Sequence, residues 1–208
     1  MEKDTKKKVK SSRKNVLKKH STNVKKKDVY EDNWIYVLLL SAVLILGEAL
    51  KGYSFPVRNF SLSYALFLLP IIYFLTNYIT KKKGYKIGVL SISVSALSMV
   101  IFVAFMNLIT GRGFDFYNVA GDFAGYFVSQ FVNITIYQFL LDNTETNFIL
   151  LYLTYVFALV INYLFYSLFY INTLSLDTYW ISYFTTITIQ GIMIVALTFI
   201  DMQVKRGV

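Results

Sequence analysis

The chain has 208 residues, of which 56% are hydrophobic, 18% aromatic and 16% charged, and its net charge is +9 at pH 7. A soluble domain carries about 25% charged residues, so this chain has too few charges to cover a water-exposed surface. It contains no cysteine, which excludes disulfides and thiolate metal sites. Its one histidine, His20, argues against a histidine-based catalytic or metal site.

Basic residues are concentrated at the start of the chain. The first 32 residues hold 12 of the 21 Lys and Arg residues and show no apolar periodicity. We therefore expect a disordered basic tail, 1–32, followed by a membrane domain, 33–208. The tail would act as an orientation signal that also contacts anionic lipid. An RNA- or ribosome-binding arm is the alternative, but no aromatic residue precedes Tyr30, so no nucleic-acid partner is expected.

The rest of the chain consists of apolar runs whose lengths are close to the roughly 20 residues that a membrane-spanning helix needs. In chain order, the six predicted spans are about 34–51, 61–80, 87–109, 119–141, 148–171 and 179–201. Lysine, glycine, proline or acidic residues separate neighbouring runs. The first run lacks the cleavage site that ends a signal peptide, so we expect it to be retained. The sequence predicts an all-α integral membrane protein with six transmembrane helices.

The distribution of Lys and Arg predicts the orientation of these helices, because cytoplasmic loops are enriched in them. If the spans alternate in direction, 18 of these residues lie on the side of the N-terminus and three on the other side. The majority side includes Lys81, Lys82, Lys83 and Lys86, interpreted as a loop after the second span. The expected protein lies in the plasma membrane with both termini in the cytoplasm.

Polar side chains inside a bilayer must be paired or line a cavity, so each is a candidate for function. The predicted spans contain Glu48, Asn77, Asn107, Asp122, Gln130, Asn133, Asn162, Gln190 and Asp201. Asn107 and Asp201 lie near span ends, where water is within reach. Glu48 lies one turn from Lys51, which favours a local ion pair.

The fourth span is the richest in polar residues. Helical spacing places Asp122, Tyr126, Ser129 and Asn133 on one face, bordered by Gln130. A small residue also recurs every fourth position from Gly121, a pattern that lets two membrane helices approach closely. This face is either a packing seam or the wall of a polar ligand cavity, and the sequence leaves both open.

Three segments in order resemble signatures of the queuosine precursor transporter family, also called the vitamin-uptake-transporter-like (VUT) family. They are LFLLPIIYFLTNYITKKKGYKIG (66–88), GDFAGYFVSQFVNITIYQFL (121–140) and LTYVFALVINYLFYSLFYI (153–171), which resemble its second, fourth and fifth helices. The resemblance implies an importer of a small polar heterocyclic solute such as a 7-deazapurine. The family typically has an aspartate in each signature, whereas this chain has Asn77, Asn133 and Asn162. An amide still forms hydrogen bonds to a heterocycle, but it is no counter-ion and no proton relay.

These observations together predict a substrate site formed by Asn77, Asp122, Gln130, Asn133 and Asn162. Two alternatives remain: the substrate-binding subunit of an energy-coupling-factor vitamin importer, with ATPase and scaffold partners, or a non-transporting membrane anchor or assembly protein. The sequence has no Ser/His/Asp set, HExxH motif or phosphate-binding glycine loop. We therefore expect no enzymatic activity, no cofactor and no metal.

Overall fold

The computed structural model describes residues 33–57, 60–111, 116–143, 147–170 and 176–204. The chain divides into two compact units, Met1–Tyr36 and Val37–Val208. In the first unit, the described residues 33–36 begin a helix, and the predicted tail lies outside the described residues. This first helix, Asn33–Leu50, continues into the second unit, which holds all other described elements.

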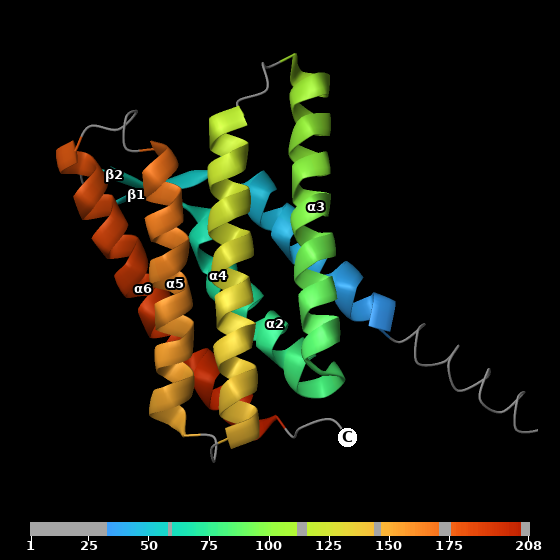
Figure 1. Cartoon of the computed structure of the whole chain (residues 1–208). Helices are drawn as coiled ribbons and strands as arrows, with labels where there is room; N and C mark the ends of the chain where they lie inside the picture. Colours follow the sequence, from blue (N-terminus) through green and yellow to red (C-terminus); the bar gives the residue numbers. More distant parts are fainter. Residues whose placement is uncertain (1–32, 58–59, 112–115, 144–146, 171–175, 205–208) are drawn as a thin grey trace, which may run out of the picture. The chain divides into compact units, whose positions relative to one another are not determined.

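Helices dominate the second unit (Figure 1). After the first helix come α2 (Leu68–Lys83), α3 (Tyr85–Thr110), α4 (Phe116–Asn143), α5 (Phe148–Tyr170) and α6 (Leu176–Gln203). Helix α4 packs against α2, α3 and α5, while α6 packs against α2 and α5. Five helical stretches are long and apolar enough to cross a membrane: Asn33–Leu50, Tyr64–Lys83, Tyr85–Thr110, Phe148–Leu168 and Ile181–Gln203.

The fourth predicted span, about 119–141, forms most of helix α4 but is not among these five stretches. Its length suffices, and its polar residues lower its hydropathy. The structure shows where those residues go: Ser129, Gln130 and Asn133 are buried against other helices. The exposed side of α4 carries Phe123 and Phe131 instead. The prediction of six spans is thus confirmed for five.

The start of the second predicted span, 61–80, is wrong. The strands β1 (Ser54–Val57) and β2 (Phe60–Ser63) pair as an antiparallel hairpin, with Ser54 opposite Ser63. A 3₁₀ turn, η1 (Tyr64–Phe67), then leads into α2. Pro70 lies in the first turn of α2, where its missing N–H is not needed for helical hydrogen bonding. The all-α prediction therefore misses one short hairpin.

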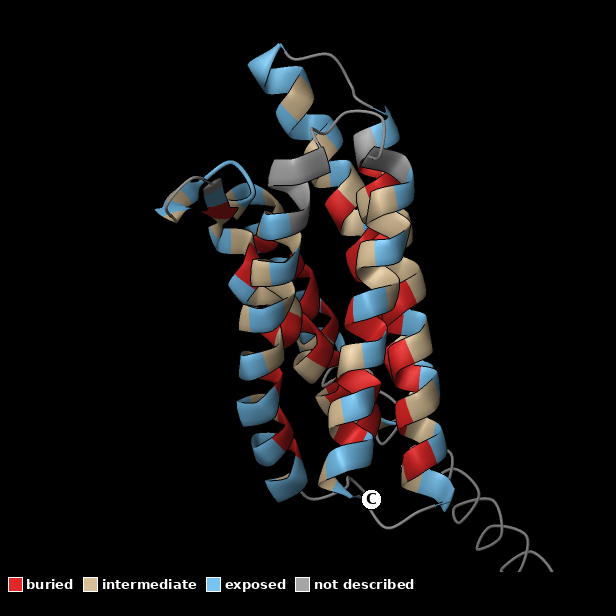
Figure 2. Cartoon of the chain, turned by 90° about the vertical axis from the view of Figure 1, so that its left-hand side faces the viewer, coloured by how far each residue is buried: buried red, intermediate tan, exposed pale blue. Residues whose placement is uncertain are grey.

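The second unit has polar groups inside and apolar groups outside, the arrangement that a lipid environment requires. Figure 2 shows the buried residues on the inward sides of the helices and the exposed residues on their outer sides. Exposed side chains include Leu97, Ile101 and Phe157, whereas Asn77 and Asn133 are fully buried. Many hydroxyl groups donate to a carbonyl one turn back in their own helix, as Thr76 does to Ile72 at 2.6 Å.

Gly125 allows α4 to approach α5 closely, as the small-residue pattern predicted. A Cβ atom at this position would lie 3.1 Å from the carbonyl oxygen of Asn162. That distance forces the backbone of one helix to move.

We expect Gly125→Val to lower the stability of the protein by about 1–3 kcal/mol, because the larger side chain overpacks the α4–α5 contact. Thermal unfolding in detergent measures the effect. Gly52→Val is the matched control, since a Cβ atom at Gly52 meets nothing within 4 Å. Equal unfolding temperatures for the two variants would contradict the close contact.

Candidate functional site

A cavity of about 480 Å³ lies at the end of the second unit that carries the hairpin. The first helix, β2 and helices α2 to α6 all contribute to its lining. Its polar lining residues include Glu48, Lys51, Asp122, Asn162 and Gln190, and its tyrosines are Tyr126, Tyr163, Tyr166 and Tyr183. The cavity thus combines ionised groups, amides and aromatic rings, which is the usual make-up of a small-molecule site.

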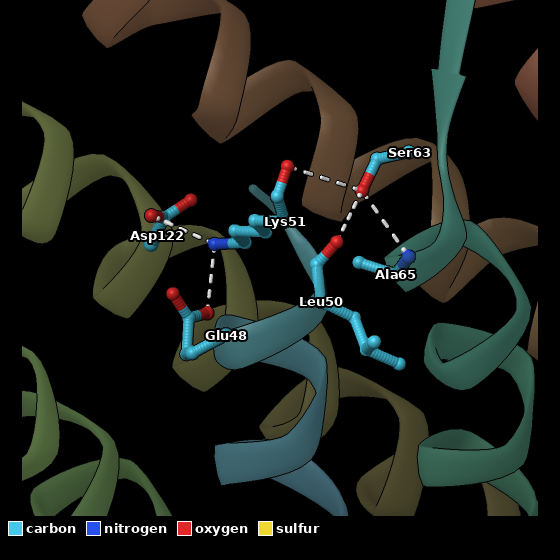
Figure 3. Close-up of polar contacts among 6 residues, drawn as sticks. All are labelled: Glu48, Leu50, Lys51, Ser63, Ala65 and Asp122. Carbon is cyan, nitrogen blue, oxygen red and sulfur yellow. Dashed lines mark hydrogen bonds and ion pairs between the residues drawn. The ribbon is translucent and has the colours of Figure 1, made fainter. Parts of the chain in front are cut away.

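Three ionised side chains of this lining meet one another (Figure 3). Because the Lys51 side chain is 40% exposed, we call this part of the cavity its mouth. The Lys51 ammonium lies 2.7 Å from Glu48 Oε1 and 2.8 Å from Asp122 Oδ2. The predicted ion pair between Glu48 and Lys51 is confirmed, and Asp122 of α4 joins it. Two carboxylates and one ammonium leave one net negative charge, so this cluster attracts a positively charged or hydrogen-bond-donating group.

The hairpin region fixes the position of Lys51. Ser63 Oγ donates to the carbonyl of Leu50 at 3.2 Å and accepts from the backbone N–H of Ala65 at 3.2 Å (Figure 3). One hydroxyl therefore joins the end of the first helix to the start of η1. Partial burial of the Lys51 ammonium disfavours its charged form, but Asp122 and Glu48 outweigh that penalty and raise the pKa of Lys51 above its ordinary value. Lys51 remains a cation at any physiological pH.

The opposite wall of the cavity is held by hydrogen bonds between α5, α6 and η1. Tyr163 Oη donates to Gln190 Oε1 at 2.8 Å, and Gln190 Nε2 donates to the carbonyl of Leu66 at 2.8 Å. The rings of Tyr163 and Tyr183 meet edge to face with centroids 4.8 Å apart. These contacts present rigid aromatic surface on which a flat ring can pack.

Beyond the cavity, α2 and α4 are joined by hydrogen bonds at matching positions. Tyr73 Oη donates to Ser129 Oγ at 3.0 Å, and one turn farther Asn133 Nδ2 donates to Asn77 Oδ1 at 2.9 Å. Both pairs are separated by 56 residues in sequence, so the two helices run parallel in constant register. We call these two pairs the polar ladder.

A buried ion pair follows the polar ladder by one more turn. Lys81 Nζ donates to the backbone oxygen of Asp201 at 2.7 Å and lies 3.2 Å from its Oδ1. Tyr137 and Tyr155 donate to the same carboxylate at 2.7 and 3.1 Å. Asp201 is 0% exposed and Lys81 6% exposed. Asp201 was expected to reach water and Lys81 to lie in a loop; both expectations are wrong, because each neutralises the other inside the helix bundle.

The five predicted site residues are not all brought together. Asp122 and Asn162 line the cavity, whereas Asn77, Gln130 and Asn133 are not among its lining residues. Asn77 and Asn133 hydrogen-bond to each other in the polar ladder. The side chain of Gln130 is fully buried, and within the described residues neither of its polar atoms has a hydrogen-bond partner.

The predicted substrate site left out several cavity residues, among them Gln190, which was one of the polar candidates in the spans. Tyr163 of α5 and Gln190 of α6 hold each other in position by a hydrogen bond. Their positions in the sequence do not reveal this pairing. Ser63 was placed inside a predicted span, which hid its role in the hairpin. Lys51 was recognised only as a partner of Glu48, and its contact with Asp122 joins elements 71 residues apart.

Within the described residues, five apolar helical stretches that enclose several buried polar side chains define the class of this molecule: it is a multi-pass helical membrane protein. Comparisons with protein-family models, with curated proteins and with solved structures found no match.

We expect Asn77→Leu and Asn133→Leu each to destabilise the protein by about 1–2 kcal/mol, because each leaves one buried amide without a partner. The double variant is expected to lose less than the sum of the two single losses, since no amide is then stranded. The free energy of unfolding in a denaturing detergent is measured for the parent protein, the two single variants and the double variant. Strictly additive losses would contradict a direct contact between the two amides.

Proposed function

We propose that this protein is a membrane transporter that imports a small polar heterocyclic solute, for which the cavity is the binding site. The observation that carries the proposal is the cavity itself, which gathers ionised, amide and aromatic side chains inside a bundle whose outer surface is apolar. A protein that serves only as an anchor has no need for such a cavity, whose polar groups must be kept inside a lipid-facing bundle.

The resemblance of three helices to queuosine precursor transporters supports a 7-deazapurine as the solute. A cavity of about 480 Å³ accommodates such a bicyclic ring. Tyr126, Tyr166 and Tyr183 supply aromatic faces, and Asn162 supplies an amide that both donates and accepts hydrogen bonds.

The ionised cluster at the cavity mouth adds a charge preference to this proposal. Asn77, Asn133 and Asn162, which lie in the three segments that resemble the family, are neutral and provide no counter-ion for a cationic solute. Glu48 and Asp122 carry one more charge than Lys51 neutralises. Charge neutralisation therefore favours a solute whose polar group is cationic or a strong hydrogen-bond donor.

The proposal includes an orientation in the plasma membrane with both termini in the cytoplasm. Its support is the excess of Lys and Arg on the side of the N-terminus, 18 against three. In this orientation the hairpin and the cavity mouth face the outside of the cell, where a solute for import arrives.

In cells that lack their own importer, we expect the protein to support uptake of labelled 7-deazapurine precursors. Asp122→Asn and Asn162→Leu are each expected to lower uptake at subsaturating solute by about tenfold, because each removes a polar group from the cavity. Asp142→Asn and Asn143→Leu are matched controls, since they make the same changes on the exposed end of α4.

Normal uptake by Asp122→Asn together with Asn162→Leu would contradict the assignment of the cavity as the binding site. Deleting residues 1–30 is expected to leave uptake intact. A phenotype that depends on these residues, without any uptake, would favour an anchor or assembly role for the chain.

Because the chain contains no cysteine, single introduced cysteines report the orientation directly. We expect an impermeant thiol reagent to label Ser54→Cys, in the exposed part of β1, from outside intact cells. It should label Ser11→Cys only after the cells are opened. The reverse pattern would contradict the proposed orientation.

A further inference from the structure

The second unit is open at one end and closed at the other. Along α2 the cavity lining stops at Ile72, and along α4 it stops at Tyr126. Past these residues the polar ladder and the ion pair between Lys81 and Asp201 fill the interior. A solute in the cavity therefore has no passage to the far end in this conformation.

The Lys81–Asp201 pair closes that far end by joining four helices. Lys81 belongs to α2, Asp201 to α6, and the tyrosines that donate to Asp201 belong to α4 and α5. Both carboxylate oxygens of Asp201 and its backbone oxygen accept hydrogen bonds.

The position of this ion pair near the ends of two helices allows its two charges to separate. Lys81 and Asp201 each lie two residues before the last residue of their helix, Lys83 and Gln203. A small displacement of α6 from α2 therefore exposes both charges to water, which solvates them. Apolar side chains at this place would have no favourable interaction with water once exposed. Charged side chains are hydrated when exposed, and their hydration stabilises the opened form.

We propose that the Lys81–Asp201 ion pair is the inner latch of the protein: it closes the bundle opposite the cavity, and its opening releases the solute on that side. The release step rests on the proposed transport function, but the closure of this end does not. Alternation between two packed arrangements is the general way in which a central site opens to each side in turn.

A buried cysteine next to the latch tests its closure without any solute. Thr198 is fully buried, donates only to the carbonyl of Ile194 in its own helix, and precedes Asp201 by one turn. In a Thr198→Cys protein, an impermeant thiol reagent applied to right-side-out and inside-out vesicles should label slowly from both faces. Lys81→Met is expected to speed labelling at least about tenfold, only from the face on which the Lys81 end of α2 lies.

Lys82→Met is the matched control, because Lys82 is the next residue of α2 and is only partly buried. It should leave the labelling rate unchanged, and Lys81→Arg, which keeps the charge, should keep labelling slow. If Lys81→Met unfolds the protein, labelling accelerates from both faces. Tyr137→Phe then provides the test, since it removes one donor to Asp201 without stranding a charge and should give a smaller acceleration from the same single face.

Equal labelling rates in the Lys81→Met and Lys82→Met proteins would overturn the latch, as would acceleration from the cavity face alone. Uptake measured on the same variants separates the two proposals. If labelling of Thr198→Cys accelerates from the one expected face but the parent protein shows no uptake, the latch is supported and transport is contradicted. Uptake by the parent with no acceleration in Lys81→Met or Tyr137→Phe contradicts the latch and leaves transport standing.

Discussion

The constraint on which the structure depends is that polar groups inside a lipid-facing bundle need partners within the chain; among the described residues, the buried Gln130 side chain is an exception. The polar ladder meets this constraint between α2 and α4, where Tyr73 bonds Ser129 and Asn77 bonds Asn133. Because the pairs recur every four residues on both helices, they fix the register of α2 against α4. A slip of one residue would strand buried amides and hydroxyls, each of which is costly to leave unpaired.

The position of the cavity follows from this register. Ser129 lies next to Asn162, whose Nδ2 is 3.4 Å from the Ser129 hydroxyl oxygen. Gly125, one turn earlier on α4, lets α5 come close enough for Asn162 to reach the cavity lining. The polar ladder thus begins where the cavity lining on α2 and α4 ends, and Glu48, Lys51 and Asp122 form the charged mouth of the cavity. The cavity is confined to the end of the bundle where the polar ladder between α2 and α4 stops.

Local patterns in the sequence predicted the parts of this arrangement that depend on near neighbours. Apolar runs of sufficient length gave five of the helices that can span a membrane, and the spacing of Glu48 and Lys51 gave their ion pair. The recurrence of small residues from Gly121 gave the close contact between α4 and α5. In each case the physical cause acts within a few turns of one helix.

The sequence could not predict what depends on distant partners. Lys81 looks like a loop residue because two lysines follow it, and only Asp201, 120 residues later, explains its burial. The hairpin of β1 and β2 is hidden because its apolar residues continue the pattern of the next span. The three asparagines that the sequence analysis grouped together do not form one site. Asn162 lines the cavity, while Asn77 and Asn133 satisfy each other.

The central claim is that water and solute enter this bundle from one end only and stop at the polar ladder. Cysteine replacements along α2, labelled in the otherwise cysteine-free chain, measure this most directly. The account predicts rapid labelling at Leu68 and Leu69, which line the cavity and are partly exposed, and protection at the buried Thr76 and Thr80. Equally rapid labelling at all four positions would reveal a continuous aqueous path and contradict the account.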